Sequence, residues 1–297
     1  MDVQYESASM LRSMQYTIAR AILRVKANPA ITATIGELGW LPFNIILDKH
    51  SVKYFYRLKH VLEPSRLCKK VFLEMEQQYL QRKRSVWPYI DVMYKTLTNV
   101  GLDSAKEKYI TDLPYVYDRL RLSLYEQEFH NEINTRSTLS LYKYLKSSTT
   151  KEKYLFNMEY FDGARLKFKA RTGCLGLQTD LKRWGLADND VCTLCGNDKE
   201  DVQHFLFTCS KLNSLRIKYF YELESKLFDS GNFHIWSHFC TSSVFIKSCI
   251  LLGSVDIHLE ECATDPIDAV CKSYLLEAWR LRKSLRDGEF SDTGQNN

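Results

Sequence analysis

The sequence predicts a mainly α fold of packed helical subdomains with no extended sheet. From Leu113 to Leu124, apolar residues recur at the three-four spacing of an amphipathic helix. Only 12 Gly and 6 Pro occur among the 297 residues, which is too few for the many tight turns of a sandwich or barrel. A composition that is 45% hydrophobic and 26% charged is typical of a globular chain rather than a disordered one.

Individual helices are predicted where this periodicity is clearest. Besides the helix that begins at Leu113, we expect helices over 7–27, 63–82, 151–171 and 210–229. A final amphipathic helix carries an apolar stripe from Ile267 to Leu285.

Residues that favour or stop helices predict the helix ends. Asn28-Pro29 should end the first helix, because the residue before a proline is disfavoured in the helical region. Gly173 is expected to cap the helix before it. Asp265-Pro266 stands where a cap and a first helical residue belong, so the final helix should begin there.

The chain divides into five predicted segments with no long flexible linker between them. They are a helical linker region, long helices leading to a cysteine- and histidine-bearing loop, the loop itself, C-terminal helices and a polar tail that should be disordered. Their predicted ranges are 1–110, 111–190, 191–209, 210–286 and 287–297.

Charge and cysteine content limit the compartment and the partners. The net charge of +5 is compatible with nucleic acid without being diagnostic of it. No window approaches 18 uninterrupted apolar residues, and the N-terminus lacks a secretory signal, so neither a membrane span nor export is expected. Nine cysteines, an odd number, favour a reducing, intracellular setting over a disulfide framework. Six are expected to be buried thiols: Cys68, Cys174, Cys240, Cys249, Cys262 and Cys271.

The strongest chemical signal lies in the stretch CTLCGNDKEDVQHFLFTC, which spans 192–209. Cys192 and Cys195 have the C-x2-C spacing that puts two thiolates on one side of a tight turn, and His204 and Cys209 follow. Three thiolates and one imidazole can close a tetrahedral site, and they suit zinc in a reducing compartment. Four protein ligands leave no position for a catalytic water, so one structural zinc ion is expected in a small loop–helix insert.

Two other interpretations of this cluster remain open at this stage. The residues can have fallen together by chance, or the two neighbouring thiols can form a redox pair. A redox pair does not need a histidine and a third cysteine at ligand spacing, which favours the metal site.

The stretch Ala164–Arg216 resembles the zinc-binding segment of non-LTR retrotransposon reverse transcriptases. In that family a helix ending in Arg-x-Gly leads through a short linker to a C-x2-C pair, a His-Phe-Leu phrase, a final Cys, and a helix carrying Leu and Arg. The matching residues here are Arg171, Gly173, Cys192, Cys195, His204, Phe205, Leu206, Cys209, Leu215 and Arg216.

The resemblance extends upstream of this segment. Ala19–Pro42 is similar to the region after the polymerase thumb, where a helix leads to a Gly-Glu-Leu-Gly-x-x-Pro phrase, and Trp87–Gly101 resembles the helix that follows. The likeness covers most of the chain in the same order. It implies the C-terminal region of an endonuclease–reverse transcriptase, comprising a post-thumb linker and the Cys-Cys-His-Cys segment.

Catalytic residues of this family are not found in the sequence. Reverse transcriptases need paired aspartates to hold two magnesium ions, and the chain has no Asp-Asp pair. Tyr160–Gly163 is a loose echo that lacks the second acid, and Asp256, Glu260 and Glu261 near Lys272 lack the strand frame of a nuclease. We therefore expect no enzymatic activity, with the polymerase region upstream in a longer polyprotein.

Basic residues on both sides of the loop are candidates for contact with nucleic acid. The resemblance implies that this region grips RNA or DNA near the polymerase. On a helix, Arg165 and Lys169 share one face, and Lys167 and Arg171 share a neighbouring one. Salt-dependent phosphate contacts and one stacking tryptophan are expected from Arg165, Lys167, Lys169, Arg171, Lys182, Arg183 and Trp184. The alternative is a solvated helical face with the tryptophan in the core.

Two other basic groups receive plainer interpretations. On the final helix, Lys272, Arg280, Arg282, Lys283 and Arg286 are expected to face water and aid solubility, with a minor chance of phosphate contact. The run 82–84 is a localisation signal or, the favoured alternative, a helix end.

Two functions compete at this stage. The first is a zinc-stabilised, nucleic-acid-binding region of a retroelement protein that has no activity of its own. The second is a zinc-stabilised helical module, derived from a retroelement, that binds other proteins. Salt-dependent binding to RNA or DNA would separate them. In either case a nuclear or cytoplasmic location is expected.

Overall fold

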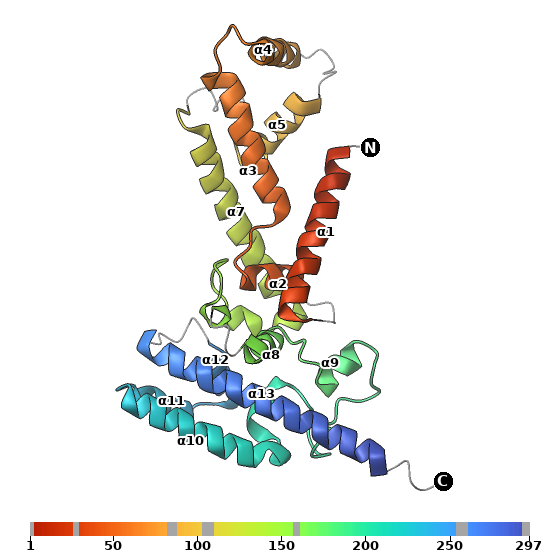
Figure 1. Cartoon of the computed structure of the whole chain (residues 1–297), viewed down its shortest axis with the longest axis vertical. Coiled ribbons are helices and arrows are strands. Elements are labelled where there is room, and N and C mark those ends of the chain that lie inside the picture. The colour runs from red at the N-terminus through yellow and green to blue at the C-terminus, as the bar shows by residue number, and fades with distance from the viewer. Residues whose placement is uncertain are drawn as a thin grey trace. The chain divides into compact units, whose positions relative to one another are not determined.

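The computed structural model describes residues 3–25, 30–81, 88–102, 110–156, 161–253 and 261–292. Within these ranges the chain is helical (Figure 1), and it contains no strand beyond one isolated antiparallel bridge between Val191 and Lys199. The predicted mainly α class is therefore confirmed. No helix in the described part of the chain combines the length and the apolar character needed to cross a membrane.

The chain forms two compact units. The first comprises Met1–Tyr16 and Leu41–Phe129, and the second comprises Thr17–Trp40 and His130–Asn297. Two boundaries fall inside helices, α1 (Val3–Leu23) and α7 (Leu113–Thr135), and the third lies between Trp40 and Leu41. The five functional segments predicted above remain a prediction, because a division by compactness does not test them.

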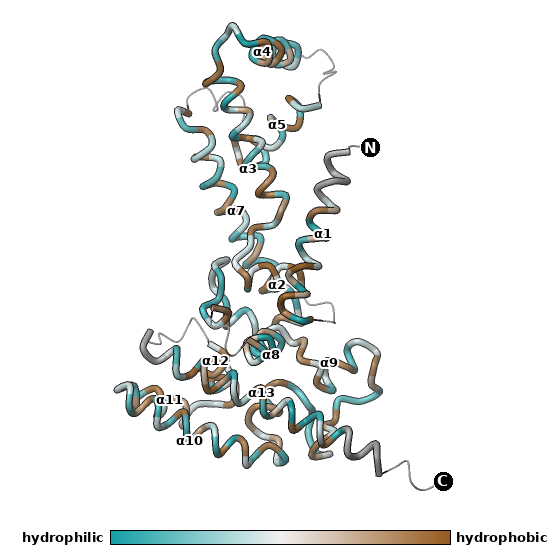
Figure 2. Tube along the Cα trace, in the orientation of Figure 1, coloured by the Kyte–Doolittle hydropathy of each residue, from teal (hydrophilic) through white to brown (hydrophobic). Residues whose placement is uncertain are grey.

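The first unit is held by an aromatic core. Its helices carry apolar residues at intervals between polar ones, as the hydropathy along the trace shows (Figure 2). Phe55 meets Phe72 and Tyr94 edge-on, with ring centroids 5.5 and 5.7 Å apart. Its elements are α1 (Val3–Leu23) as far as Tyr16, α3 (Phe43–Tyr56), the π-helical turn η1 (Arg57–Val61), α4 (Leu67–Leu80), α5 (Pro88–Thr98) and α7 (Leu113–Thr135) as far as Phe129.

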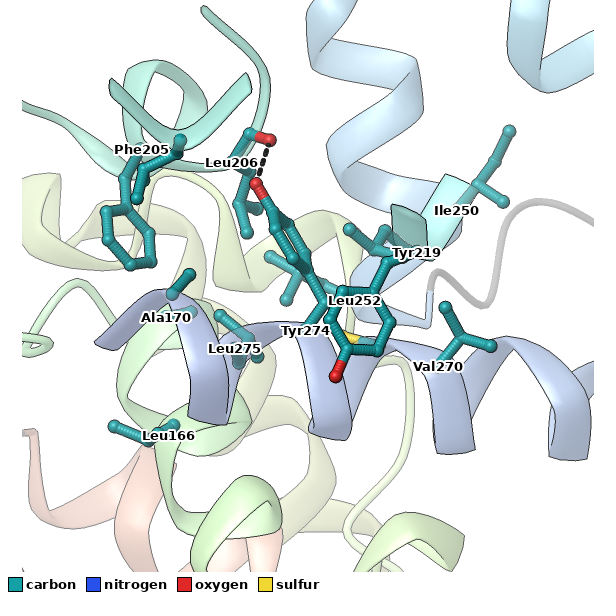
Figure 3. Close-up of a cluster of buried hydrophobic side chains, with 14 of the residues drawn as sticks. Leu166, Ala170, Phe205, Leu206, Tyr219, Ile250, Leu252, Val270, Tyr274 and Leu275 are labelled. Atoms are coloured by element: carbon teal, nitrogen blue, oxygen red, sulfur yellow. Dashed lines mark hydrogen bonds between the residues drawn. The ribbon is translucent and has the colours of Figure 1, made fainter. Parts of the chain in front are cut away.

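The second unit is built around α8 (Phe161–Arg171) and α13 (Glu261–Asp292), which pack along each other. The close-up in Figure 3 shows side chains from several elements meeting at Tyr274, whose hydroxyl donates to the Leu206 carbonyl at 2.7 Å. The remaining elements are α2 (Ile31–Glu37), the short turns η2 (Ser137–Leu139), η3 (Tyr142–Tyr144) and η4 (Lys153–Leu155), α9 (Gln178–Arg183), η5 (His204–Thr208), η6 (Ser210–Leu212), α10 (Asn213–Asp229), α11 (Phe233–Thr241) and α12 (Val244–Leu252).

Several predicted helices agree with the structure and two differ at their starts. Leu113 does begin α7, and α10 fills most of the predicted 210–229. The helix predicted over 151–171 is wrong at its beginning, since α8 starts at Phe161 and 153–155 form a 3-10 turn. The final helix begins at Glu261 rather than at Pro266, which lies inside it.

The observed ends of the helices can be compared with the predicted ones. Gly173 has φ of 61°, and the N–H of Cys174 donates to the Lys169 carbonyl at 2.9 Å, which is the predicted cap. The helix α13 continues to Asp292, so 287–292 are helical where the composition predicted disorder. Asn28-Pro29, the run 82–84 and Trp87 lie outside the described residues.

A buried ion network anchors α8 within the second unit. The Arg171 side chain is 1% exposed, and its Nε lies 2.8 Å from Oε1 of the fully buried Glu37. Its guanidinium also lies 3.1 Å from Glu152 and donates to the Leu145 carbonyl at 3.0 Å. The Tyr142 hydroxyl donates to Glu37 at 2.8 Å. Buried charges need such pairing. The network therefore fixes the C-terminal end of α8, after which the chain continues toward the 192–209 loop.

A second buried network joins α8 to α13. Asp268 accepts Lys167 at 2.8 Å and Lys272 at 2.5 Å, and both lysine side chains are at most 3% exposed. The expectation that Lys272 and Arg282 face water is wrong, because both are 1% exposed. Burial is possible because each has a carboxylate partner inside the unit.

The cysteines outside the 192–209 loop differ in burial. Cys174, Cys249 and Cys271 are buried as expected, whereas Cys68 and Cys240 are exposed and contradict the expectation. The side chain of Cys262 lies outside the described ones.

Replacing Asp268 tests the second network through its pH dependence. Burial raises the pKa of this carboxyl, but Lys167 and Lys272 outweigh it, so the pKa lies below its ordinary value of 3.8. The carboxylate therefore contributes stability above pH 3.8 that is lost as pH falls through the folded value. We expect Asp268→Asn to lower the free energy of unfolding by about 3 kcal/mol or more at pH 7 in urea titrations.

The difference from wild type should shrink as the pH falls below 3.8. The control Asp188→Asn changes an exposed loop carboxylate and should have little effect at either pH. A loss for Asp268→Asn that stays constant down to the lowest pH would contradict the role assigned to this carboxylate.

Candidate metal centre

The first half of the cysteine–histidine loop is a tight reversal. The bridge between Val191 and Lys199 closes its base, and the Cys192 N–H donates to the Asp198 carbonyl at 2.7 Å. Gly196 has φ of 73°, a conformation that costs glycine little, and its N–H donates to the Cys192 carbonyl at 2.8 Å. This reversal brings the two thiols of the C-x2-C pair to the same side.

The second half is a short helix that starts directly after Asp201. The Asp201 Oδ1 accepts the His204 N–H at 2.8 Å, which caps the first turn. The turn then widens into η5, where the Cys209 N–H donates to the His204 carbonyl five residues back at 2.9 Å. Five residues make close to one full turn of a π-helix, so His204 and Cys209 come onto the same side.

The four predicted ligands form one cluster. Their donor atoms, on Cys192, Cys195, His204 and Cys209, all lie within 4.8 Å of one another. The sulfurs of Cys192 and Cys209 are 3.9 Å apart, and the Cys195 sulfur is 3.4 Å from the His204 Nε2. Tetrahedral zinc with Zn–S bonds of about 2.3 Å would separate two sulfurs by about 3.8 Å and sulfur from nitrogen by about 3.6 Å.

These distances favour the metal site over the two other interpretations. The three cysteines are free thiols, and His204 and Cys209 converge on the C-x2-C pair, which a redox pair does not require. The donor set of three sulfurs and one imidazole nitrogen fits a single structural zinc ion, and the residues that would hold it are the four predicted ones.

The protonation of the thiols follows from burial and backbone contacts. Burial raises the pKa of Cys192 to about 12, although backbone N–H groups partly offset it, and burial also raises the pKa of Cys209. For Cys195 the effect of burial is outweighed by N–H groups of Asn197 and Asp198, and the pKa is lowered. Backbone donors thus already favour a thiolate at the more accessible sulfur.

A neighbouring hydroxyl orients the imidazole. Thr208 Oγ1 lies 2.9 Å from the His204 Nδ1, on the side of the ring opposite the Nε2 that faces Cys195. With Nε2 on a metal, Nδ1 carries the proton and donates to the threonine. Such a second contact fixes the ring orientation and the tautomer of a ligating histidine.

Two side chains hold the loop's backbone carbonyls. Arg216 on α10 donates from Nε to the Leu206 carbonyl at 3.1 Å and from Nη2 to the Cys209 carbonyl at 3.0 Å. The hydroxyl of Tyr274 donates to the same Leu206 carbonyl (Figure 3). Phe205 and Leu206 are buried beside Cys192 and Cys209 in one apolar cluster, so the site lies against apolar side chains.

A buried ion pair ties the loop to α13. Glu200 is fully buried, and its two carboxylate oxygens each accept from the Arg282 guanidinium at 2.7 Å. One of them also accepts the Gln178 N–H at 2.8 Å, and the Thr179 hydroxyl donates to the Glu200 carbonyl at 2.9 Å. A single residue of the loop is therefore bonded to both α9 and α13.

The basic residues predicted to contact nucleic acid separate into two groups. Lys167 and Arg171 point into the unit, where they are 3% and 1% exposed and paired with Asp268, Glu37 and Glu152. Their charges are already engaged, and a phosphate cannot reach them in this structure. These two belong to the architecture of the fold.

The other candidates lie on the outside of α8 and on α9. Lys182 is 50% exposed beside Asp190, and Arg183 is 38% exposed beside Asp180. Arg165 is 16% exposed and pairs with Asp162, and Lys169 is partly exposed. Trp184 is half-buried against an apolar cluster, with the Arg183 guanidinium 5.9 Å from its ring centroid.

Sequence reasoning did not find Glu200 and Arg282 as parts of the centre. Glu200 follows the polar residues 197–199, which are exposed, so nothing in its immediate neighbours indicates burial. Arg282 carried a usable signal, since it falls on the apolar face of the final helix with Cys271, Leu275 and Ala278. A charge in that position predicts a buried partner.

The comparisons agree with this site. The family model described as zinc-binding in reverse transcriptase matches residues 137–215, a range that includes all four ligands. Comparison with curated proteins and with solved structures found no match. The matched segment is thus similar to the zinc-binding segment of reverse transcriptases.

Removing one ligand tests the metal site. We expect one equivalent of zinc in the purified protein and less than one in Cys195→Ser, because three remaining ligands hold the ion more weakly. Mass spectrometry of metals after passage over a chelating column measures this. The control Cys240→Ser removes an exposed thiol on α11 and should keep one equivalent. Full occupancy in Cys195→Ser, or none in wild type, would rule out this ligand set.

Replacing Glu200 tests the link between the loop and α13. In Glu200→Gln the buried Arg282 loses its carboxylate, so we expect about 3–5 kcal/mol less free energy of unfolding and faster zinc loss to a chelator. The control Glu222→Gln breaks a surface pair with Lys226, in which the glutamate is 39% exposed, and should cost less than about 1 kcal/mol. Equal effects of the two changes would contradict the assigned link.

Proposed function

We propose that the protein is a zinc-stabilised region that binds RNA or DNA and derives from a retrotransposon reverse transcriptase. The observation that carries this is the four-ligand cluster inside a segment matched by a reverse-transcriptase zinc-binding family model. The family model matched is the zinc-binding one, so we assign binding rather than catalysis to this chain. A polymerase region would then act from a longer polyprotein, inside the cell.

The zinc ion has a structural part in this function. It closes the 192–209 loop, and the loop in turn is bonded through Glu200 to α9 and α13. The energy of zinc binding therefore stabilises the positions of the helices that carry exposed cations. Binding of nucleic acid itself is assigned to those cations and not to the metal.

Lys182 and Arg183 are the best candidates for phosphate contact next to the loop. They stand on one short helix, α9, whose start is held by Glu200 and by Asp180. Both are more than a third exposed, and each has one nearby carboxylate that a phosphate can replace. Cations of this kind release counterions on binding, so affinity should fall steeply with salt.

A second candidate function is a protein-binding module of retroelement origin. The observation in its favour is a set of exposed apolar residues on α10, where Ile217, Tyr221 and Phe228 are 65%, 73% and 69% exposed. They recur at spacings that put them on one face of that helix. A preparation that binds no nucleic acid at low salt would favour this function over the first.

Charge reversal on α9 tests nucleic-acid binding. In Lys182→Glu combined with Arg183→Glu, we expect weaker retention of RNA or DNA in a gel-shift assay. The slope of log affinity against log salt should fall by roughly one unit for each cation that no longer meets a phosphate. Fluorescence anisotropy across a salt series measures the slope.

The matched control reverses two exposed lysines on α10, Lys218→Glu with Lys226→Glu. It should leave both the affinity and the salt slope unchanged. Unfolding is excluded as the cause by equal zinc content in all preparations. Unchanged affinity in the α9 variant would remove Lys182 and Arg183 from the binding surface.

A further inference from the structure

Four cations of the second unit, from α8, α13 and the residue after α1, lie around one end of α8. Arg165 and Lys169 stand one turn apart on α8, Arg24 follows the end of α1, and Lys283 is an exposed residue of α13. All belong to the second compact unit, in which α8 contacts both the end of α1 and α13 (Figure 1). We call Arg24, Arg165, Lys169 and Lys283 the α8 cation cluster.

The arginines of this cluster are tied together at the end of α1. Arg24 and Arg165 both approach the same Asp162 oxygen, at 3.2 and 2.9 Å. Arg165 also donates from Nε to the Ile22 carbonyl at 2.8 Å, which joins α8 to α1. Arg24 has φ of 49°, unusual for a residue other than glycine, and its side chain is 67% exposed. The backbone thus turns sharply and leaves this guanidinium in solvent.

The two lysines of the cluster, Lys169 and Lys283, extend the positive charge toward the C-terminal end of α8. Burial is the main cause that lowers the pKa of Lys169, and the Cys174 thiol opposes it. Smaller repulsions from Lys283, Arg165 and Arg24 lower the pKa further. Three cations therefore lie close enough to Lys169 to repel its charge. One carboxylate, Asp162, pairs with two of the four. A bound polyanion would relieve this repulsion.

The cluster offers cations but no platform for bases. Phe161, the aromatic residue nearest to Arg165, is partly buried and has the Arg165 guanidinium 4.4 Å from its ring centroid. Trp184 packs against the same buried cluster, which contains Leu23 and Phe168, with Arg183 over its ring. The exposed aromatic side chains in the described ranges of this unit lie elsewhere, on η3, after η4, on α10 and on α11. Base stacking on exposed rings is the usual means of gripping single strands.

We propose that the α8 cation cluster binds the sugar–phosphate backbone of a nucleic-acid duplex without reading its bases. This rests on the proposed function and specifies its partner. A duplex presents one phosphate charge about every 1.7 Å of its axis, which suits a surface made of cations only, whereas its stacked bases need no aromatic partner. Arg24 and Lys283 thereby join the binding surface beside the residues of α8.

The test compares a labelled duplex of mixed sequence, a second duplex of different base composition, and a single strand of equal length. Affinity of the full chain for each is measured by fluorescence anisotropy across a salt series. Wild type should bind both duplexes equally and the single strand more weakly. In Arg24→Glu with Lys283→Glu, the salt slope on duplex should fall by roughly two units, about one for each cation.

Two further variants keep the result interpretable. Arg24→Gln with Lys283→Gln removes charge without adding repulsion and should weaken duplex binding in the same direction by a smaller factor. Lys218→Glu with Lys226→Glu makes the same charge change on α10 and should bind as wild type does. Equal zinc content in every preparation shows that the fold is kept.

The outcomes separate this proposal from the proposed function. Wild type that binds no nucleic acid, or that binds anionic lipid vesicles but not duplex, overturns both. If wild type binds and the α9 reversal weakens binding while Arg24→Glu with Lys283→Glu does not, the cluster alone is wrong. Tighter binding to the single strand, or a preference between the two duplexes, also overturns backbone recognition by this cluster.

Discussion

Convergence of three sulfurs and one nitrogen on a single point is the constraint on which the second unit depends. The loop between Cys192 and Cys209 has little regular structure of its own, with one isolated bridge and one turn of π-helix. Two of its thiols are buried, and burial disfavours their charged forms. A divalent cation would favour the thiolate forms, because its charge compensates theirs, and by binding all four side chains it would also close the loop.

Buried charge pairs connect this loop to the helices around it and so fix their positions. Glu200, eight residues from Cys192, is fully buried and holds Arg282 on α13 through two hydrogen bonds. On the other side of α8, Arg171 meets Glu37, so the Arg-x-Gly and Gly-Glu-Leu-Gly phrases that suggested the family meet in space. Gly39 has φ of 67° and lies so close to Lys151 that a side chain there would collide with it. These contacts explain why the phrases contain those residues.

The fold class and the ligand set could be predicted because both depend on local pattern. Apolar periodicity predicts helices, and C-x2-C followed by His204 and Cys209 predicts a tetrahedral site. What could not be predicted depends on contacts between distant residues. Lys167 and Lys169 differ by two positions and look alike in sequence, yet one is buried against Asp268 and the other is partly exposed. Lys167 is buried because α13 brings Asp268 next to it, and the local sequence around Lys167 does not predict where α13 packs.

X-ray absorption spectroscopy at the zinc edge tests the central claim most directly, because it reports the atoms bound to the metal in the intact protein. Coordination by Cys192, Cys195, His204 and Cys209 requires three sulfurs at about 2.3 Å and one nitrogen at about 2.0–2.1 Å. A spectrum with that shell would agree with the geometry described above. A shell dominated by oxygen or nitrogen, or one with fewer than three sulfurs, would contradict it.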